Sequence, residues 1–269
     1  MRINWKKTII MTLDVVIAAY LILAFTSFNK PDETTRKCTK VSINIQDEMT
    51  NGFLDTKEIK KWLEQKNLYP LGKPMRYVIA RNIEDMLKES PFVKTAECYK
   101  TEDGHVCINL TQRMPIVRIK NYKGEDYYID DHDAIMPNTK YTSDMIIATG
   151  YITKWYAQRY ISTLSKTIMY DDFWKNQIEQ INILPDKGVE LIPRVGNHII
   201  YLGALPESNL KKERKQEIED FVTHKLDRLK KFYKYGLSQA GWNKYSYINL
   251  EFDNQIICKK HNIENIQNW

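Results

Sequence analysis

The sequence predicts an α+β protein: one N-terminal transmembrane helix, a small domain of order β-α-α-β-β, and a β-rich domain with an antiparallel or mixed sheet and flanking helices. Three observations predict this class. An apolar segment of 20 residues lies near the N-terminus, two amphipathic helical patterns lie between strand patterns, and short alternating patterns dominate after residue 126. Aromatic residues make up 12% of the 269 residues, which also favours sheets.

The apolar segment, residues 9–28, has the length that one helix needs to cross a bilayer. Asp14 lies near its N-terminal end, where a charge costs less than at the bilayer centre. The segment exceeds a signal-peptide core, and no small-residue cleavage site follows it. We therefore expect an uncleaved anchor between a short tail, residues 1–8, and a linker, residues 29–40. The positive charges on its two sides nearly balance, so they do not decide its orientation.

Charge and cysteine content exclude several classes of protein. The formal net charge of +6 is spread along the chain and is interpreted as solvated surface, not as a nucleic-acid-binding stripe. The four cysteines form neither a CxxC pair nor a zinc spacing. Cys98 and Cys107 are expected on opposite faces of their strands, which argues against a disulfide between them.

The first domain begins with a strand, in which Val41 and Ile43 alternate with polar residues. Asp55 followed by Glu58 predicts a capping box that opens a helix. A second helix is expected over residues 76–89, and residues 101–104 predict a hairpin turn between two strands.

The second domain is expected to contain strands and two longer helices. One helix is predicted over residues 153–169. The other begins with the mixed-charge run of residues 211–217 and continues past Tyr233; we interpret its charges as a solvated face. Two strands end the domain. In the first, Ile248, Leu250 and Phe252 alternate with polar residues, and the second runs over residues 255–260.

Three motifs give the chain a resemblance to a known family. Two segments resemble the POTRA-domain signature of the bacterial cell-division family FtsQ/DivIB. They are Ser-Pro-Phe-Val at residues 90–93 and Gln-Arg-Met-Pro-Ile-Val-Arg-Ile at residues 112–119. Gln112 stands where that family usually has Glu. Residues 127–137 resemble the opening of the family's β domain, with Ala134 at a common Gly position. Residues 191–196, Leu-Ile-Pro-Arg-Val-Gly, resemble its Bacteroidetes-type branch, FtsQ of the Bacteroidetes.

The resemblance implies a POTRA domain over residues 41–114, an FtsQ-type β domain over residues 115–261 and a C-terminal tail over residues 262–269. It also implies a non-catalytic scaffold in the periplasm that binds the membrane-anchored division proteins FtsB and FtsL. A strand that nothing follows tends to lie at a sheet edge, where it can accept a partner's strand. The partner-binding residues that the resemblance implies are Phe252, Asn254, Gln255, Ile256, Ile257 and Cys258.

The sequence contains no recognisable catalytic motif, and we expect neither an enzyme nor a cofactor. Residues 130–133, Asp-Asp-His-Asp, could be mistaken for a metal site. Consecutive turn residues are expected to point in different directions, so we interpret them as a turn and expect no metal. Two alternatives stay open: a membrane-anchored periplasmic enzyme with an undetected site, and a POTRA-type chaperone for envelope protein assembly.

Overall fold

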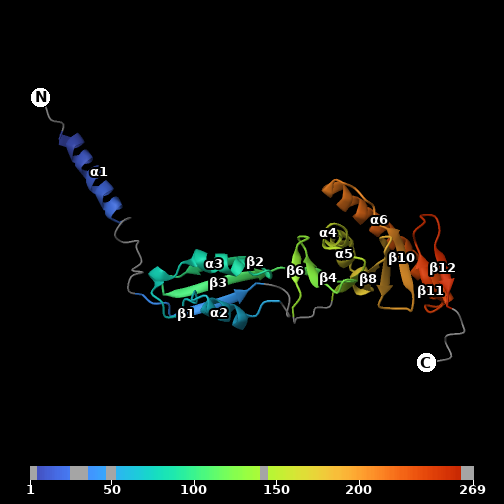
Figure 1. Cartoon of the computed structure of the whole chain (residues 1–269). Helices are drawn as coiled ribbons and strands as arrows, with labels where there is room; N and C mark the ends of the chain where they lie inside the picture. Colours follow the sequence, from blue (N-terminus) through green and yellow to red (C-terminus); the bar gives the residue numbers. More distant parts are fainter. Residues whose placement is uncertain (1–4, 25–35, 47–52, 140–144, 262–269) are drawn as a thin grey trace. The chain divides into compact units, whose positions relative to one another are not determined.

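The computed structural model describes residues 5–24, 36–46, 53–139 and 145–261 (Figure 1). The chain forms two compact units. The first unit comprises residues 1–46 and 54–111, and the second comprises residues 47–53 and 112–269. Each unit has its own hydrophobic core.

Helix α1 (Trp5–Leu23) covers most of the segment for which we expected a transmembrane anchor. Residues 25–28 of that segment lie outside the described residues. Within the described part of the chain, no helix combines the length and the apolar character that a membrane span requires.

The first unit has the predicted order β-α-α-β-β. Its sheet has the order β1-β3-β2, and β1 runs parallel to β3. The side chain of Asp55 caps the first helix by accepting a hydrogen bond from the Lys57 N–H. These elements are β1 (Lys40–Ile45), α2 (Thr56–Gln65), α3 (Ala80–Lys88), β2 (Val93–Lys100) and β3 (His105–Gln112).

The second helix of this unit begins later than predicted. A 3₁₀ turn over Met75–Tyr77 precedes it, and Val78 and Ile79 then adopt extended backbone angles. Branching at Cβ restricts the side chains of Val and Ile in a helix and favours extended backbone, so the helix starts only at Ala80.

The second unit is built on one mixed sheet of nine strands, in the order β12-β11-β10-β9-β8-β7-β4-β5-β6. Three neighbouring pairs are parallel, namely β4 with β7, β7 with β8, and β10 with β11, and the other pairs are antiparallel. The strands are β4 (Pro115–Asn121), β5 (Asp126–Asp130), β6 (Ile135–Pro137), β7 (Ile146–Gly150), β8 (Ile178–Ile183), β9 (Gly188–Pro193), β10 (Ile199–Ala204), β11 (Tyr245–Asn249) and β12 (Ile257–Lys260).

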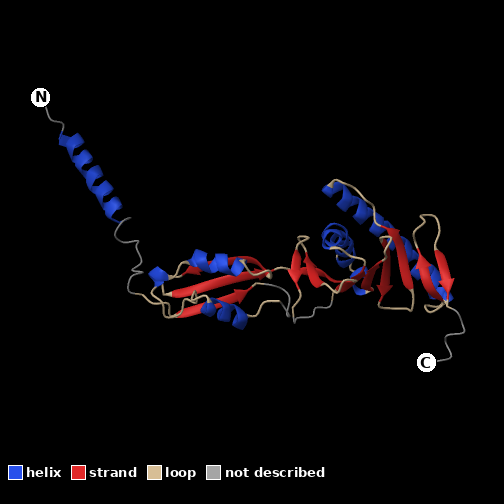
Figure 2. Ribbon diagram, in the orientation of Figure 1, coloured by secondary structure: helices blue, strands red, loops and turns tan. Residues whose placement is uncertain are grey.

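Helices cover one face of this sheet (Figure 2). The helix predicted over residues 153–169 forms in three parts: α4 (Lys154–Tyr156), a π turn (Ala157–Ile161) and α5 (Ser162–Met169). The long helix α6 (Lys211–Phe232) continues through a second π turn, Tyr233–Leu237, into α7 (Ser238–Ala240). Their apolar residues and one face of the sheet form a single core.

Two local features interrupt the regular alternation of side chains along the strands. A β-bulge between Ile178 and Gln180 lets Ile178 and Ile181 face the same core despite their odd spacing. Strand β11 ends at Asn249, so the alternation expected to reach Phe252 stops after the buried Leu250, and Phe252 is 48% exposed.

Candidate interaction site

Strand β12 is an edge strand. It is the last strand in the sheet order, and β11 is the only described strand that pairs with it. The opposite edge is β6, a three-residue strand that ends in a proline, and short strands and prolines both discourage further pairing. The expectation that the last strand lies at a sheet edge is confirmed.

The register of the β11–β12 pair decides which backbone groups of β12 are open. The His261 N–H donates to the Lys244 carbonyl, with 3.3 Å between nitrogen and oxygen. Backbone groups alternate in direction along an antiparallel strand, so those of Ile257 and Lys259 also face β11. The bulge in this pair adds a residue to β11 and leaves the alternation of β12 intact. The N–H groups of Cys258 and Lys260 and the C=O of Cys258 therefore point away from the sheet, whereas the C=O of Lys260 accepts a hydrogen bond from Ser246 Oγ at 3.4 Å.

The side chains of β12 divide between the two faces of the sheet. Cys258 and the preceding Ile256 pack against the core that α6 covers, and burial raises the pKa of the Cys258 thiol. Ile257 is 47% exposed, and Lys259 is exposed beside it on the opposite face. Ile256 and Cys258 thus hold the strand in place, whereas Ile257 presents an apolar side chain to solvent.

Two cations of α6 hold the loop between β11 and β12. Lys225 is buried, and its Nζ donates to the Glu251 carbonyl at 2.7 Å and to Asp253 Oδ1 at 2.8 Å. This hydrogen bond and the charge of Lys225 hold the pKa of the Asp253 carboxyl below its usual value. Arg228 Nη2 donates to the Gln255 carbonyl at 2.8 Å. The helix therefore fixes where β12 begins.

All six residues that the resemblance implied lie in this hairpin, but in different parts of it. Ile257 and Cys258 lie within β12, whereas the other four occupy the loop before it. Sequence reasoning missed Lys225 and Arg228. The spacing offered a signal for Lys225, because it falls on the apolar stripe of α6 with Val222 and Leu229, where a charge needs a partner.

The acidic turn of residues 130–133 differs from its expectation. Ligand atoms of Asp130, Asp131 and His132 lie within 4.8 Å of one another, so these consecutive side chains converge. Several of their polar atoms already have partners within the protein. Asp130 Oδ1 accepts from the N–H groups of His132 and Ala134, and His132 Nδ1 lies 2.7 Å from Asp131 Oδ1. A metal ion would have to displace these contacts.

The motif residues next to this turn have structural roles. Arg113 Nε and Nη2 both lie 2.7 Å from Oδ2 of the buried Asp130, so the ion pair ties the start of the unit to the end of β5. Gln112 is buried, and its Oε1 accepts a hydrogen bond from the Phe53 N–H at 2.8 Å. A neutral amide meets this N–H without the cost of a buried charge.

Comparisons with known proteins agree with this architecture. Residues 36–111 match a POTRA-like domain, and residues 114–259 match the family described as FtsQ/DivIB, C-terminal related. A comparison with curated proteins finds no match. The second match spans more than half of the chain and indicates a divisome-associated role that involves protein–protein interactions. The chain therefore belongs to the FtsQ/DivIB family.

Proposed function

We propose that the chain is a non-catalytic scaffold of the divisome that binds FtsB- and FtsL-type partners through β12 and helps to control septal peptidoglycan synthesis. One observation carries this proposal: β12 lies at the sheet edge, where the backbone groups of Cys258 and the N–H of Lys260 face away from β11. An extended partner segment can pair with such an edge, since main-chain hydrogen bonds supply affinity and neighbouring side chains supply selectivity.

The exposed side chains around β12 suggest what the partner segment carries. Ile257 and Phe252 offer apolar surface to a partner residue that lies above or below the added strand. Lys259 and Lys260 favour acidic residues in the partner, and without a partner they discourage edge-to-edge pairing between copies of the chain. Asn254 and Gln255 are exposed in the loop and can accept or donate polar contacts.

The proposal includes the location of the protein. Residues 9–28 anchor it in the inner membrane as a single span, with residues 1–8 in the cytoplasm and the two units in the periplasm at the division septum. The apolar composition of the segment and the family membership support this arrangement.

A matched pair of double variants tests the edge-strand mechanism. Cys258→Pro/Lys260→Pro removes both outward N–H groups. Cys258→Ala/Lys260→Ala removes the same two side chains but keeps both N–H groups. Two lost hydrogen bonds of roughly 1 kcal/mol each predict that the proline variant binds the FtsB–FtsL-type pair about tenfold or more weakly than the alanine variant. The measurement is the equilibrium affinity of the full-length chain for that pair.

The melting temperatures of the two variants are compared in parallel, so that a folding defect is recognised. The single variant Ile257→Asp probes the exposed side chain, leaves the backbone donors in place and should also weaken binding. Equal affinities of the proline and alanine variants, at equal melting temperatures, would refute edge-strand capture.

A further inference from the structure

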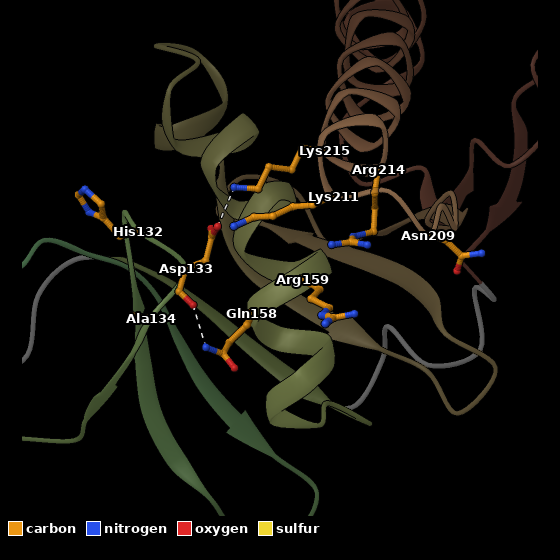
Figure 3. Close-up of a pocket in the computed structure, with 9 residues that line it drawn as sticks. All are labelled: His132, Asp133, Ala134, Gln158, Arg159, Asn209, Lys211, Arg214 and Lys215. Carbon is orange, nitrogen blue, oxygen red and sulfur yellow. Dashed lines mark hydrogen bonds and ion pairs between the residues drawn. The ribbon is translucent and has the colours of Figure 1, made fainter.

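A cavity of about 420 Å³ lies between the β5–β6 turn, the π turn before α5, and the start of α6 (Figure 3). It belongs wholly to the second unit and involves none of the residues of the β12 edge. Its lining is mostly polar and comprises His132, Asp133, Ala134, Gln158, Arg159, Asn209, Lys211, Arg214 and Lys215.

The lining is strongly cationic. It contains two arginines and two lysines but one carboxylate, that of Asp133. The Asp133 carboxylate is already paired, because the Nζ atoms of Lys166 and Lys215 both donate to it, Lys215 at 2.6 Å. Among the residues that the structure describes, none forms an ion pair with Arg159, Lys211 or Arg214. The cavity therefore holds an excess of positive charge without an internal partner.

Arg214 provides the independent sign of a ligand. The residue is only 5% exposed, and no atom of the described residues accepts a hydrogen bond from its Nε. Nη1 donates to the Ser208 carbonyl at 3.0 Å, and the guanidinium lies 5.4 Å from the ring centre of Tyr160. A buried guanidinium with an unused donor costs free energy unless an acceptor arrives. The sequence pattern had assigned Arg214 to a solvated helix face, and the structure shows that this is wrong.

The N-terminal end of α6 adds to the positive electrostatic potential in the cavity. This helix has 22 residues, and no side chain caps its first turn. Unsatisfied N–H groups and the positive end of the helix dipole favour an anion at such a terminus. Glu213 is the acidic residue of that turn, but it is exposed and does not line the cavity.

We propose that this cavity binds a phosphate or diphosphate group. A multiply charged anion balances the excess of cations better than one carboxylate would, and the arginine fork suits the geometry of phosphate oxygens. The volume leaves room for part of the molecule that carries the group. A free phosphate compound and the headgroup of a lipid share this chemistry.

Calorimetric titrations of the full-length chain test the proposal with three probes: inorganic phosphate, inorganic diphosphate and soluble dihexanoyl phosphatidic acid. We expect diphosphate to bind and to raise the melting temperature. Arg159→Gln/Lys211→Gln should weaken binding about tenfold or more, because it removes two exposed charges without disturbing the core. Lys212→Gln is the matched control, since Lys212 neighbours Lys211 but does not line the cavity.

The three probes also distinguish the source of the phosphate. Tighter binding of dihexanoyl phosphatidic acid than of inorganic phosphate supports a lipid headgroup, and the reverse order supports a free phosphate compound. Absence of binding by all three overturns the proposal. Equal loss of affinity in the Lys212→Gln control also overturns it, because the effect would then come from the general positive charge of the surface. Either result leaves the proposal for β12 untouched.

Discussion

Asp133 shows how one side chain gains a role that its sequence context does not reveal. It stands in the turn after β5 with a φ of 65°, a conformation that Asp tolerates better than most residues. This backbone turns its carboxylate toward α5 and α6, where Ser162 Oγ donates to it at 2.7 Å and Lys166 and Lys215 pair with it. Burial alone would raise the pKa of the carboxyl, but these hydrogen bonds outweigh burial and lower the pKa to about 2.

We therefore expect Asp133→Asn to destabilise the second unit by about 2 kcal/mol at pH 7, since lowering a pKa by one corresponds to about 1.4 kcal/mol. The folded pKa lies below the ordinary value of 3.8. The contribution is therefore fully present above about pH 5 and is lost as the pH falls through 4 toward 2. Chemical unfolding of both proteins at pH 7 and pH 3 measures this. A difference in stability that stays constant between the two pH values would contradict the assignment.

At the scale of elements, the β11–β12 hairpin depends on α6. The strand pairing alone gives an edge hairpin with one covered face, and such hairpins are marginally stable by themselves. Lys225 and Arg228 add hydrogen bonds from the helix to the loop, at the carbonyls of Glu251 and Gln255. A buried amine on the apolar stripe of a helix is costly, and here its partners lie in the loop that begins β12.

We expect Lys225→Met to loosen this hairpin without unfolding the second unit. Methionine fills the same space but donates no hydrogen bond, and loss of hydrogen bonds from a charged group costs roughly 1.5–3 kcal/mol. The amides of Ile257 and Lys259, which face β11, should therefore exchange with solvent about tenfold or more faster in hydrogen-exchange mass spectrometry.

Lys231→Met, an exposed change on the same helix, is the control and should leave the exchange unchanged. Unaltered exchange at Ile257 and Lys259 in Lys225→Met would show that the helix does not hold the hairpin.

For the whole molecule, the two cores share no residue. Ile83 and Leu87 of α3 belong to the core of the first unit, whereas Leu164 of α5 belongs to that of the second. Hydrophobic stabilisation arises from burial within each core. A core substitution should therefore change the stability of the unit that contains it and leave the stability of the other unit unchanged.

Leu87→Ala should therefore destabilise the first unit by about 2–5 kcal/mol and lower one calorimetric transition by roughly 10 °C or more. Binding of the FtsB–FtsL-type pair should persist, because β12 belongs to the second unit. Leu164→Ala is the matched change in the other core and should lower the other transition. A single transition that both variants shift equally would show that the units unfold together.

The sequence alone predicted the elements whose signals are local. Alternation identified β1 and β3, Asp55 marked the start of α2, and the last strand patterns indicated the terminal hairpin that contains the six residues proposed to bind a partner. These features follow from backbone geometry within a few residues, so they are readable without the fold. The motif residues also indicated membership of the FtsQ/DivIB family, and the comparisons confirmed that membership.

The tertiary structure decided what depends on distant segments. Arg214 and Lys212 stand in one charged run, yet the fold buries Arg214 against a cavity and leaves Lys212 in solvent. Among the strands that the structure describes, the sheet order leaves β12 with β11 as its one neighbour, which its own residues do not specify. Burial and strand pairing join segments far apart in the chain, and the energy of a charge or an open backbone group depends on that surrounding structure.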